Sequence, residues 1–229
     1  ENGYIDIHGG GQDLKFPHHE NEIAQSIACH HHPIAHIWMH NQMININNQK
    51  MSKSLGNVLW AKDLLEQLGC NVYKWLMLST HYRNPLNFTD DVLNNVKKEV
   101  EKVENILKQS SLYLQVHHCL ENEYCQETVD EMVKALSDDL NTSLALTQIL
   151  GQVKVLNQLM RVKDKDNIMI SKGYQTLVKM LDMMGFLHET KVLSEADIAL
   201  YQNWQKKKSE KNFEQADLLR KELQDKGII

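Results

Sequence analysis

The stretch that decides the fold is GYIDIHGGGQDLKFPHHENEIAQSIAC, residues 3–29. Gly3 to Ile7 alternates apolar and polar residues and leads into the glycines at 9–11, a pattern typical of a short strand followed by a turn at which the backbone approaches a ligand. Pro17 suits a first helical position, and residues 18–29 then predict a helix. This order of strand, glycine turn and helix indicates the edge of an open α/β sheet.

Outward from this stretch, the chain divides into an α/β part and a helical part. Residues 34–46 supply the side chains of one or two strands, Asn47-Asn48 is a turn signal, and residues 50–57 form a polar loop. The boundary lies near residues 80–92, where Pro85 interrupts the helical pattern. From about residue 61 onward, periodicity and end signals predict helices at 61–68, 71–79, 90–115, 143–160, 172–184, 195–209 and 212–226.

The composition excludes several classes of protein. With 42% hydrophobic and 24% charged residues, the chain has the composition of a soluble globular protein, and no apolar run approaches the roughly 20 residues of a membrane span. Its four cysteines form no CxxC pair, which favours reduced thiols in the cytosol. A net charge of −5 argues against a generally basic nucleic-acid binder, so any RNA contact must come from local patches. Because the chain opens at Glu1 without a methionine, we interpret it as a fragment.

The strongest chemical signal is FPHHENE at residues 16–22. If a helix begins at Pro17, His18 and Glu22 are four residues apart and share one face. An imidazole nitrogen and a carboxylate oxygen at that spacing can bind one Zn²⁺. Two ligands do not make a site, so at least one or two more must come from elsewhere. His19 and Glu20 are a poorer pair because neighbours on a helix point about 100° apart. The alternative is a polar helix N-terminus at which the helix dipole favours acidic residues.

The second signal is KMSKSLGN at residues 50–57. Lys50 and Lys53 alternate with Ser52 and Ser54 in a loop that a glycine ends. Such a loop can wrap a polyphosphate, because the ammonium groups neutralise charge while hydroxyls and backbone amides add hydrogen bonds. The alternative is an exposed charged turn.

These motifs resemble those of a known family. KMSKS at residues 50–54 is similar to a signature of class I aminoacyl-tRNA synthetases, and DIHGGGQDL at 6–14 with FPHHENE at 16–22 resembles the cysteine-specific family, the cysteinyl-tRNA synthetases. The resemblance covers nearly the whole chain, since further similar stretches lie at residues 69–83, 138–142 and 211–228.

The resemblance implies an α/β Rossmann-type catalytic portion, incomplete here, followed by an all-α helical bundle domain. Residues 1–60 would be the C-terminal part of the catalytic domain with the KMSKS loop. Residues 61–91 would form a helical connecting region similar to a stem-contact region. Residues 92–229 would be the helical tRNA-binding domain, truncated at its C-terminus.

The resemblance also implies a zinc ion bound by two cysteines, one histidine and one glutamate. His18 and Glu22 match the last two ligands, and the two cysteines would lie upstream of Glu1, as would the second class I signature, HIGH. Zinc binds a thiolate far better than a hydroxyl, so the metal would separate cysteine from serine more strongly than a methylene-sized pocket could.

The implied activity is ATP-dependent ligation of L-cysteine to tRNA(Cys) through a cysteinyl-adenylate, by a cytoplasmic monomer with no membrane association. ATP would act with Mg²⁺, and Lys53, helped by Lys50, would stabilise charge on the phosphates. The ATP-binding residues expected from the resemblance are Lys53, Lys50, Ser52, Gly11 and His40, with Gly10 and Gly11 letting the ribose approach the backbone. The expected substrate contacts are His8, Asp13 and His19, whereas Trp38 and Met39 are expected to pack in the core.

Two other interpretations stay open. One is the related ligase that joins cysteine to an amino sugar in mycothiol synthesis, which shares the zinc and lysine-loop motifs. The other is a non-catalytic fragment that binds tRNA or metal. The helical region from residue 92, with its DDLNT stretch at 138–142, favours the tRNA enzyme. Because the HIGH signature does not occur in these 229 residues, we expect them to be inactive in isolation.

Overall fold

The computed structural model describes residues 4–52 and 56–229. These residues form two compact units, the first made of Glu1–Lys97 with Leu140–Ser143 and the second of Lys98–Asp139 with Leu144–Ile229. Within the described residues, every strand lies in the first unit and the second unit is helical. The predicted order of an α/β part followed by an all-α part is therefore confirmed.

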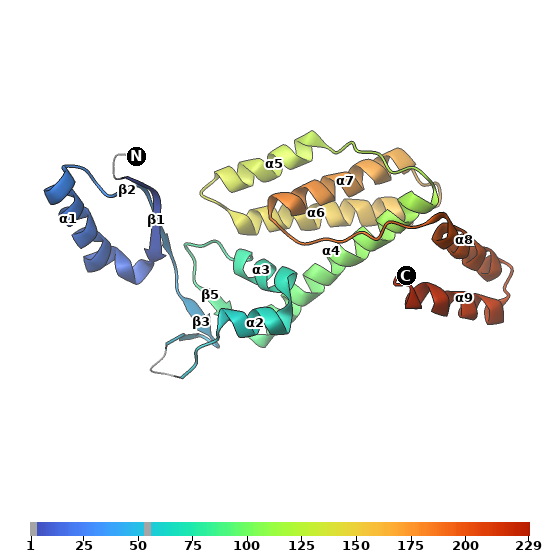
Figure 1. The fold of residues 1–229 in the computed structure, drawn as a ribbon, viewed down its shortest axis with the longest axis horizontal. Helices are drawn as coiled ribbons and strands as arrows, with labels where there is room; N and C mark the ends of the chain where they lie inside the picture. The colour runs from blue at the N-terminus through green and yellow to red at the C-terminus, as the bar shows by residue number, and fades with distance from the viewer. Residues whose placement is uncertain (1–3, 53–55) are drawn as a thin grey trace. The chain divides into compact units, whose positions relative to one another are not determined.

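The first unit begins with a strand–helix–strand arrangement (Figure 1). Strands β1 (Ile5–Gly11) and β2 (Ala35–Asn41) pair in parallel, and α1 (Glu20–His30) connects them. The strand extends through all three glycines rather than ending at Ile7. The helix starts later than Pro17, because a 3₁₀ turn at Gln12–Leu14 and a π turn at Lys15–His19, broken by the extended backbone of Phe16 (φ −139°, ψ 132°), come first.

The two faces of this small sheet differ in chemistry. Alternation along β1 and β2 puts His8, Trp38 and His40 on one face, and side chains of this face contact residues of the α1 region. On the opposite face, large apolar side chains are exposed in the described part of the chain: Ile5, Ile7 and Ile37. The face that α1 covers is thus the polar and aromatic one.

A second sheet of the first unit has the strand order β4-β3-β5. β3 (Ile44–Ile46) and β4 (Gln49–Lys50) form a hairpin whose predicted turn, Asn47-Asn48, has positive φ at both residues (49° and 65°), as a two-residue hairpin turn requires. β5 (Leu86–Phe88) pairs in parallel with β3 and was not predicted. Its Asn87 exchanges hydrogen bonds with Asn48, at 3.0 and 2.7 Å, so β5 holds the turn in place.

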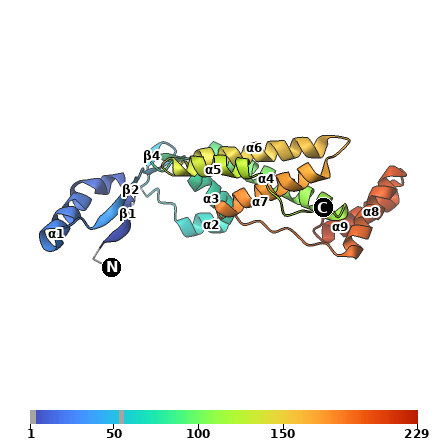
Figure 2. The same cartoon turned by 90° about the horizontal axis from the view of Figure 1, so that it is seen from above.

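The remaining helices of the first unit and those of the second largely follow the predicted ranges. They are α2 (Ala61–Leu68), α3 (Cys70–Leu78), α4 (Asp90–Val116), α5 (Gln126–Ser137), α6 (Thr142–Arg161) and α7 (Asn167–Met183). α5 was not predicted. Within the second unit, α5, α6 and α7 lie side by side in both Figures 1 and 2. Their shared core contains fully buried side chains, among them Met132, Ile149, Leu156, Ile170 and Leu177.

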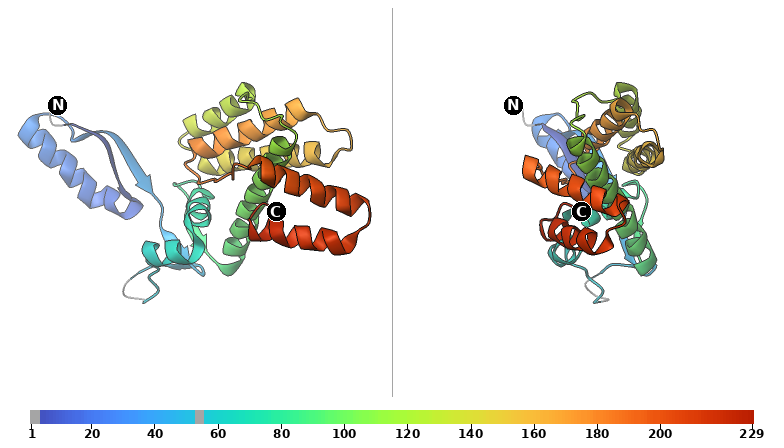
Figure 3. Two further views of the ribbon diagram at one scale, coloured as in Figure 1. Left: turned by 45° about the vertical axis from the view of Figure 1, so that its right-hand side comes forward. Right: turned by 90° about the vertical axis from the view of Figure 1, so that its right-hand side faces the viewer.

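Two short helices end the second unit. α8 (Glu195–Ser209) and α9 (Phe213–Asp225) pack against each other as a hairpin (Figure 3). The predicted N-cap Asn212 accepts a hydrogen bond from the backbone of Gln215, and Gly227 beyond the helix has a φ of +65°. No helix in residues 4–52 and 56–229 combines the length and the apolar character needed to cross a membrane.

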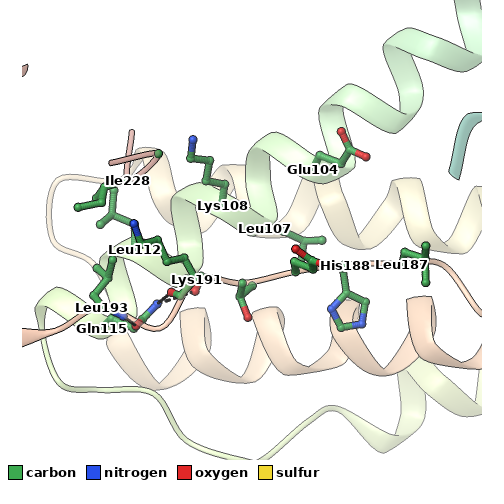
Figure 4. A pocket seen from close by; sticks show the side chains of 14 residues that line it. Glu104, Leu107, Lys108, Leu112, Gln115, Leu187, His188, Lys191, Leu193 and Ile228 are labelled. Atoms are coloured by element: carbon green, nitrogen blue, oxygen red, sulfur yellow. Dashed lines mark hydrogen bonds between the residues drawn. The ribbon is translucent and has the colours of Figure 1, made fainter. Parts of the chain in front are cut away.

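The segment that leads from α7 to α8 crosses α4 and is attached to it by Gln115. The Nε2 of Gln115 donates to the carbonyl of Lys191 (3.0 Å), and its Oε1 accepts from the amide of Leu193 (2.8 Å). Together, the segment, α4 and the chain end near Ile228 line a half-open pocket of about 350 Å³ (Figure 4). Its walls mix leucines with acidic and basic side chains in near balance, so the pocket has no marked charge preference.

Asp197 connects the two ends of the α8–α9 hairpin, and this predicts a pH-dependent stability. Its carboxylate accepts from Lys226 Nζ (3.0 Å) and from Ser194 Oγ (2.8 Å), and these bonds, that from Lys226 foremost, lower the pKa of Asp197 from 3.8 to about 2. A lowered pKa stabilises the fold above pH 3.8, and this contribution is lost as the pH falls through about 2. We expect Asp197→Asn to lower the thermal unfolding midpoint at pH 6, with a difference from wild type that shrinks below pH 3.8.

The exposed Asp217 of α9 provides the matched control. Asp217→Asn should leave the unfolding midpoint unchanged across the same pH range. An Asp197→Asn protein with the wild-type midpoint at pH 6 would show that this carboxylate does not stabilise the hairpin. Because the pair is near the surface, added salt should weaken the effect.

Candidate functional site

Side chains from β1 and α1 meet at the carboxylate of Glu22. His8 Nε2 lies 2.8 Å from Glu22 Oε2, and His18 Nε2 lies 3.2 Å from Glu22 Oε1. His18 and Glu22 share a helix face because they are four residues apart, as the sequence predicted. The two carboxylate oxygens are therefore divided between two imidazoles, and the His18 side of the carboxylate is open, with 60% of the His18 side chain exposed.

A second pair of histidines lies beneath this surface. His19 is only 3% exposed, and its Nδ1 is 2.8 Å from Nε2 of His40 on β2, so one ring nitrogen donates to the other and the tautomers decide which. Desolvation lowers the pKa of His40 below its ordinary value of 6.5, and the nearby imidazole of His19 and ammonium of Lys15 lower it further. A neutral His40 at pH 7 suits this hydrogen bond.

Trp38 is in ring contact with both sets of histidines. Its ring meets that of His8 edge-on, with centroids 4.7 Å apart and an 85° angle between planes, and it is tilted against His19 at 5.1 Å. It is parallel to His40 at 6.2 Å. The predicted core packing of Trp38 and Met39 is wrong, because both side chains are only half-buried, and Trp38 contacts histidine rings instead.

The donor set fits a zinc ion. In the described part of the chain, ligand atoms of His8, His19 and Glu22 all lie within 4.8 Å of one another. His18 is not part of this group, although its Nε2 lies 3.2 Å from Glu22 Oε1. Imidazole nitrogens and carboxylate oxygens are zinc ligands. The structure brings together the predicted ligands His18 and Glu22, and it adds His8 and His19, which were predicted as substrate contacts; all four assignments stay predictions.

Two glycines of β1, Gly10 and Gly11, lie where a Cβ would come too close to other atoms, which the sequence did not reveal. A Cβ at Gly10 would lie 2.8 Å from Cε1 of His19 and 3.0 Å from Leu14, and a Cβ at Gly11 would lie 2.5 Å from Oδ1 of Asp13. Carbon atoms pack at about 3.5–4.0 Å. At Gly10 the missing side chain therefore makes room for a buried histidine ring, whether or not a ribose also approaches there.

The side chain of Asn57 is hydrogen-bonded to the backbone at the start of the lysine loop. Lys50 is exposed on β4, and the backbone amide of Ser52 donates to Asn57 Oδ1 (2.9 Å), while Asn57 Nδ2 donates to the carbonyl of Lys50 (3.3 Å). Lys53, the residue predicted to stabilise the phosphates, lies outside the described residues. Asn57 was not predicted as a site residue, although asparagine side chains commonly bond backbone groups in turns.

Comparison with family models assigns two segments of the chain. Residues 2–98 match the model described as "tRNA synthetases class I (C) catalytic domain". Residues 131–188 match the model described as "DALR domain".

The chain is also similar to curated proteins along nearly its full length. It is 39% identical over 227 residues to "Cysteine--tRNA ligase" of Acholeplasma laidlawii, a match that covers 99% of this chain and 50% of the relative. The protein of the same name from Onion yellows phytoplasma is 38% identical over 225 residues, covering 98% of this chain and 50% of the relative. The chain thus spans about half the length of the curated relatives it matches.

Solved structures share the fold at low sequence identity. The LeuRS of Agrobacterium radiobacter K84, in a ternary complex with tRNA and LeuAMS, has a TM-score of 0.62 at 16% identity, covering 77% of this chain and 25% of its own. The methionyl-tRNA synthetase of Mycobacterium tuberculosis with methionyl-adenylate has a TM-score of 0.55 at 18% identity, covering 79% of this chain and 40% of its own. At this identity, the likeness is one of fold.

The contact between Gly10 and His19 predicts a sharp difference between neighbouring glycines. Gly10→Ala should displace the His19 ring, lower the free energy of unfolding by about 1–3 kcal/mol, as overpacking does, and alter the ring ¹⁵N shifts of His19 and His40. Gly9→Ala is the matched control, because its Cβ would meet the nearest atom at an ordinary 3.5 Å. Denaturant unfolding and histidine NMR measure both effects. If both alanine variants behave alike, the close approach at Gly10 does not matter.

Proposed function

The chain belongs, through residues 2–98 and 131–188, to the class I (C) tRNA synthetase catalytic-domain and DALR-domain families, and from this membership we propose that the protein ligates cysteine to tRNA. The proposed reaction uses ATP and passes through a cysteinyl-adenylate. Zinc bound near α1 would select the thiol. The relatives named "Cysteine--tRNA ligase", which match 98–99% of this chain, support the amino acid in this proposal.

One observation supports the metal part of the proposal above all others. His18 Nε2 and Glu22 Oε1 are 3.2 Å apart. His18 lies in the turn just before α1, and Glu22 lies in the first turn of α1. Two atoms bound to one tetrahedral zinc at about 2.0–2.2 Å would be separated by about 3.3 Å. The pair is therefore already spaced as two ligands of one ion, and the remaining ligands would come from other residues.

In this proposal, His18 and Glu22 hold the metal, and His8 orients Glu22 by binding its other oxygen. A bound zinc ion would supply a Lewis acid that takes a thiolate and discriminates against a hydroxyl. The exposed side of His18 leaves room for a small external ligand to reach the site. His8, His19 and Asp13 remain candidates for contacts with the substrate.

The lysine loop would serve the ATP half of the reaction. The cysteine carboxylate would attack the α-phosphate of ATP, and pyrophosphate would leave with its bonding electrons. Lys53 would stabilise the negative charge that builds on the phosphates, helped by Lys50 and Ser52. Asn57 would support this loop by holding its two ends, with Gly11 and His40 as further candidate ATP contacts. Magnesium would accompany ATP on the phosphate oxygens.

The ribose hydroxyl of tRNA(Cys) would then take the cysteinyl group. We assign residues 1–60 to the catalytic part, 61–91 to a connecting region and 92–229 to tRNA binding, in a monomeric cytoplasmic protein. The amino-sugar ligase is the competing function. The DALR-domain match at residues 131–188 favours the tRNA ligase, because the curated relatives that align over this region are named as tRNA ligases.

The zinc assignment predicts the metal content of two histidine variants. His18→Ala should lose most of its bound zinc when the purified full-length protein is analysed by elemental mass spectrometry. His30→Ala, an exposed histidine at the end of α1, is the control and should keep wild-type zinc. Equal zinc in wild type and His18→Ala would remove His18 from the ligand set.

The phosphate role of Lys53 predicts a selective kinetic defect. Lys53→Ala in the full-length protein should slow cysteine-dependent ATP–pyrophosphate exchange by about 10²–10³-fold while barely changing cysteine binding, because one contact to developing charge is lost. Lys62→Ala, an exposed lysine of α2, should exchange at the wild-type rate. Equal losses in exchange and cysteine binding would mean that Lys53 has a structural role. A full-length protein that catalyses the exchange but then joins cysteine to an amino sugar, and not to tRNA, would favour the competing ligase.

A further inference from the structure

Trp38 lies directly opposite His8 in the register of β1 and β2. The two side chains are on the same face of the sheet, and the edge-on geometry, at 4.7 Å and 85°, is one that aromatic rings prefer. An imidazole on a strand can rotate about χ1 and χ2 unless neighbours hold it. In this structure, the indole ring of Trp38 is such a neighbour.

The orientation of His8 is transmitted to Glu22. His8 Nε2 binds Glu22 Oε2 at 2.8 Å, which leaves Oε1 directed at His18, 3.2 Å away. If His8 turned, Oε2 would lose this partner and the carboxylate would be free to rotate. The path from Trp38 to the pair His18–Glu22 therefore has two contacts, one between rings and one hydrogen bond.

Trp38 also contacts the rings of the second histidine pair, His19 and His40. It is tilted against His19 at 5.1 Å and parallel to His40 at 6.2 Å, and these two imidazoles are hydrogen-bonded to each other. A tryptophan of the ordinary core looks different: Trp75 on α3 is 1% exposed, whereas Trp38 is only half-buried. Trp38 thus has ring contacts with three histidines.

We propose that Trp38 is a positioning residue of the metal site, which fixes the ring of His8 and thereby directs Glu22 Oε1 toward the ion. This inference rests on the proposed zinc function, since it names how this chain prepares its own ligands. Residues that orient metal ligands typically change metal affinity by about 10- to 100-fold when they are replaced. Trp38 would act through a ring contact rather than through a hydrogen bond.

The test distinguishes an effect of the aromatic ring contact of Trp38 from an effect of its side-chain volume. Trp38→Phe keeps an aromatic edge, and Trp38→Leu keeps an apolar side chain without one. The matched control is Trp60→Ala, an exposed tryptophan just before α2. Each full-length variant is first checked for wild-type circular dichroism and unfolding midpoint. Zinc affinity is then measured by competition with a chromophoric chelator, and the ring ¹⁵N shifts of the histidines are recorded in metal-free protein.

We expect Trp38→Leu to bind zinc at least about tenfold more weakly and to show altered ring shifts for His8, with Trp38→Phe and Trp60→Ala close to wild type. A folded Trp38→Leu protein with wild-type affinity and unchanged His8 shifts overturns the proposal, as does a Trp38→Phe protein as weak as Trp38→Leu. The histidine shifts need no metal. If wild type itself binds no zinc, the proposed function fails, and unchanged shifts in Trp38→Leu would separately reject the role of Trp38.

Discussion

The arrangement of the candidate site depends on one constraint, the parallel register of β1 and β2. This register places His8 opposite Trp38 and Gly10 opposite His40, so that three rings and one bare backbone position share a face. A shift of β2 by one residue would turn Trp38 and His40 to the other face, away from His8 and Gly10. The contacts of Trp38 with His8 and His40 are therefore consequences of strand pairing.

Several helices were predictable because their end signals are local. The α2 range was matched at both ends and the α9 range closely, since Gly69, Asn212 and Gly227 are end signals that act within one turn. α5 was missed because it buries only three side chains and because its N-cap, Cys125, is not one of the residue types preferred at that position. β5 was missed because a three-residue strand next to Pro85 has no periodicity to detect, and its pairing with β3 is a tertiary contact.

The difference between local signals and tertiary contacts also applies to the candidate site. The pairing of His18 with Glu22 was predictable because it depends on helical spacing alone. The bond between His8 and Glu22 joins residues 14 apart, and that between His19 and His40 joins residues 21 apart, so both depend on how a strand and a helix pack. The role of Asn57 at the base of the lysine loop depends likewise on a loop closing over itself. Sequence patterns identified the residue types, and packing decided their partners.

Packing also explains why two adjacent histidines would have different roles. Neighbours on a helix point about 100° apart, and here that angle separates a side chain that is 60% exposed, His18, from one that is 3% exposed, His19. The Nδ1 of His19 already has a partner in His40, which fixes the ring. A metal that must receive an external thiol needs an open coordination position beside its protein ligands. That requirement favours His18 as the ligand and leaves His19 to support the site from below, in contact with Trp38 and the backbone of Gly10.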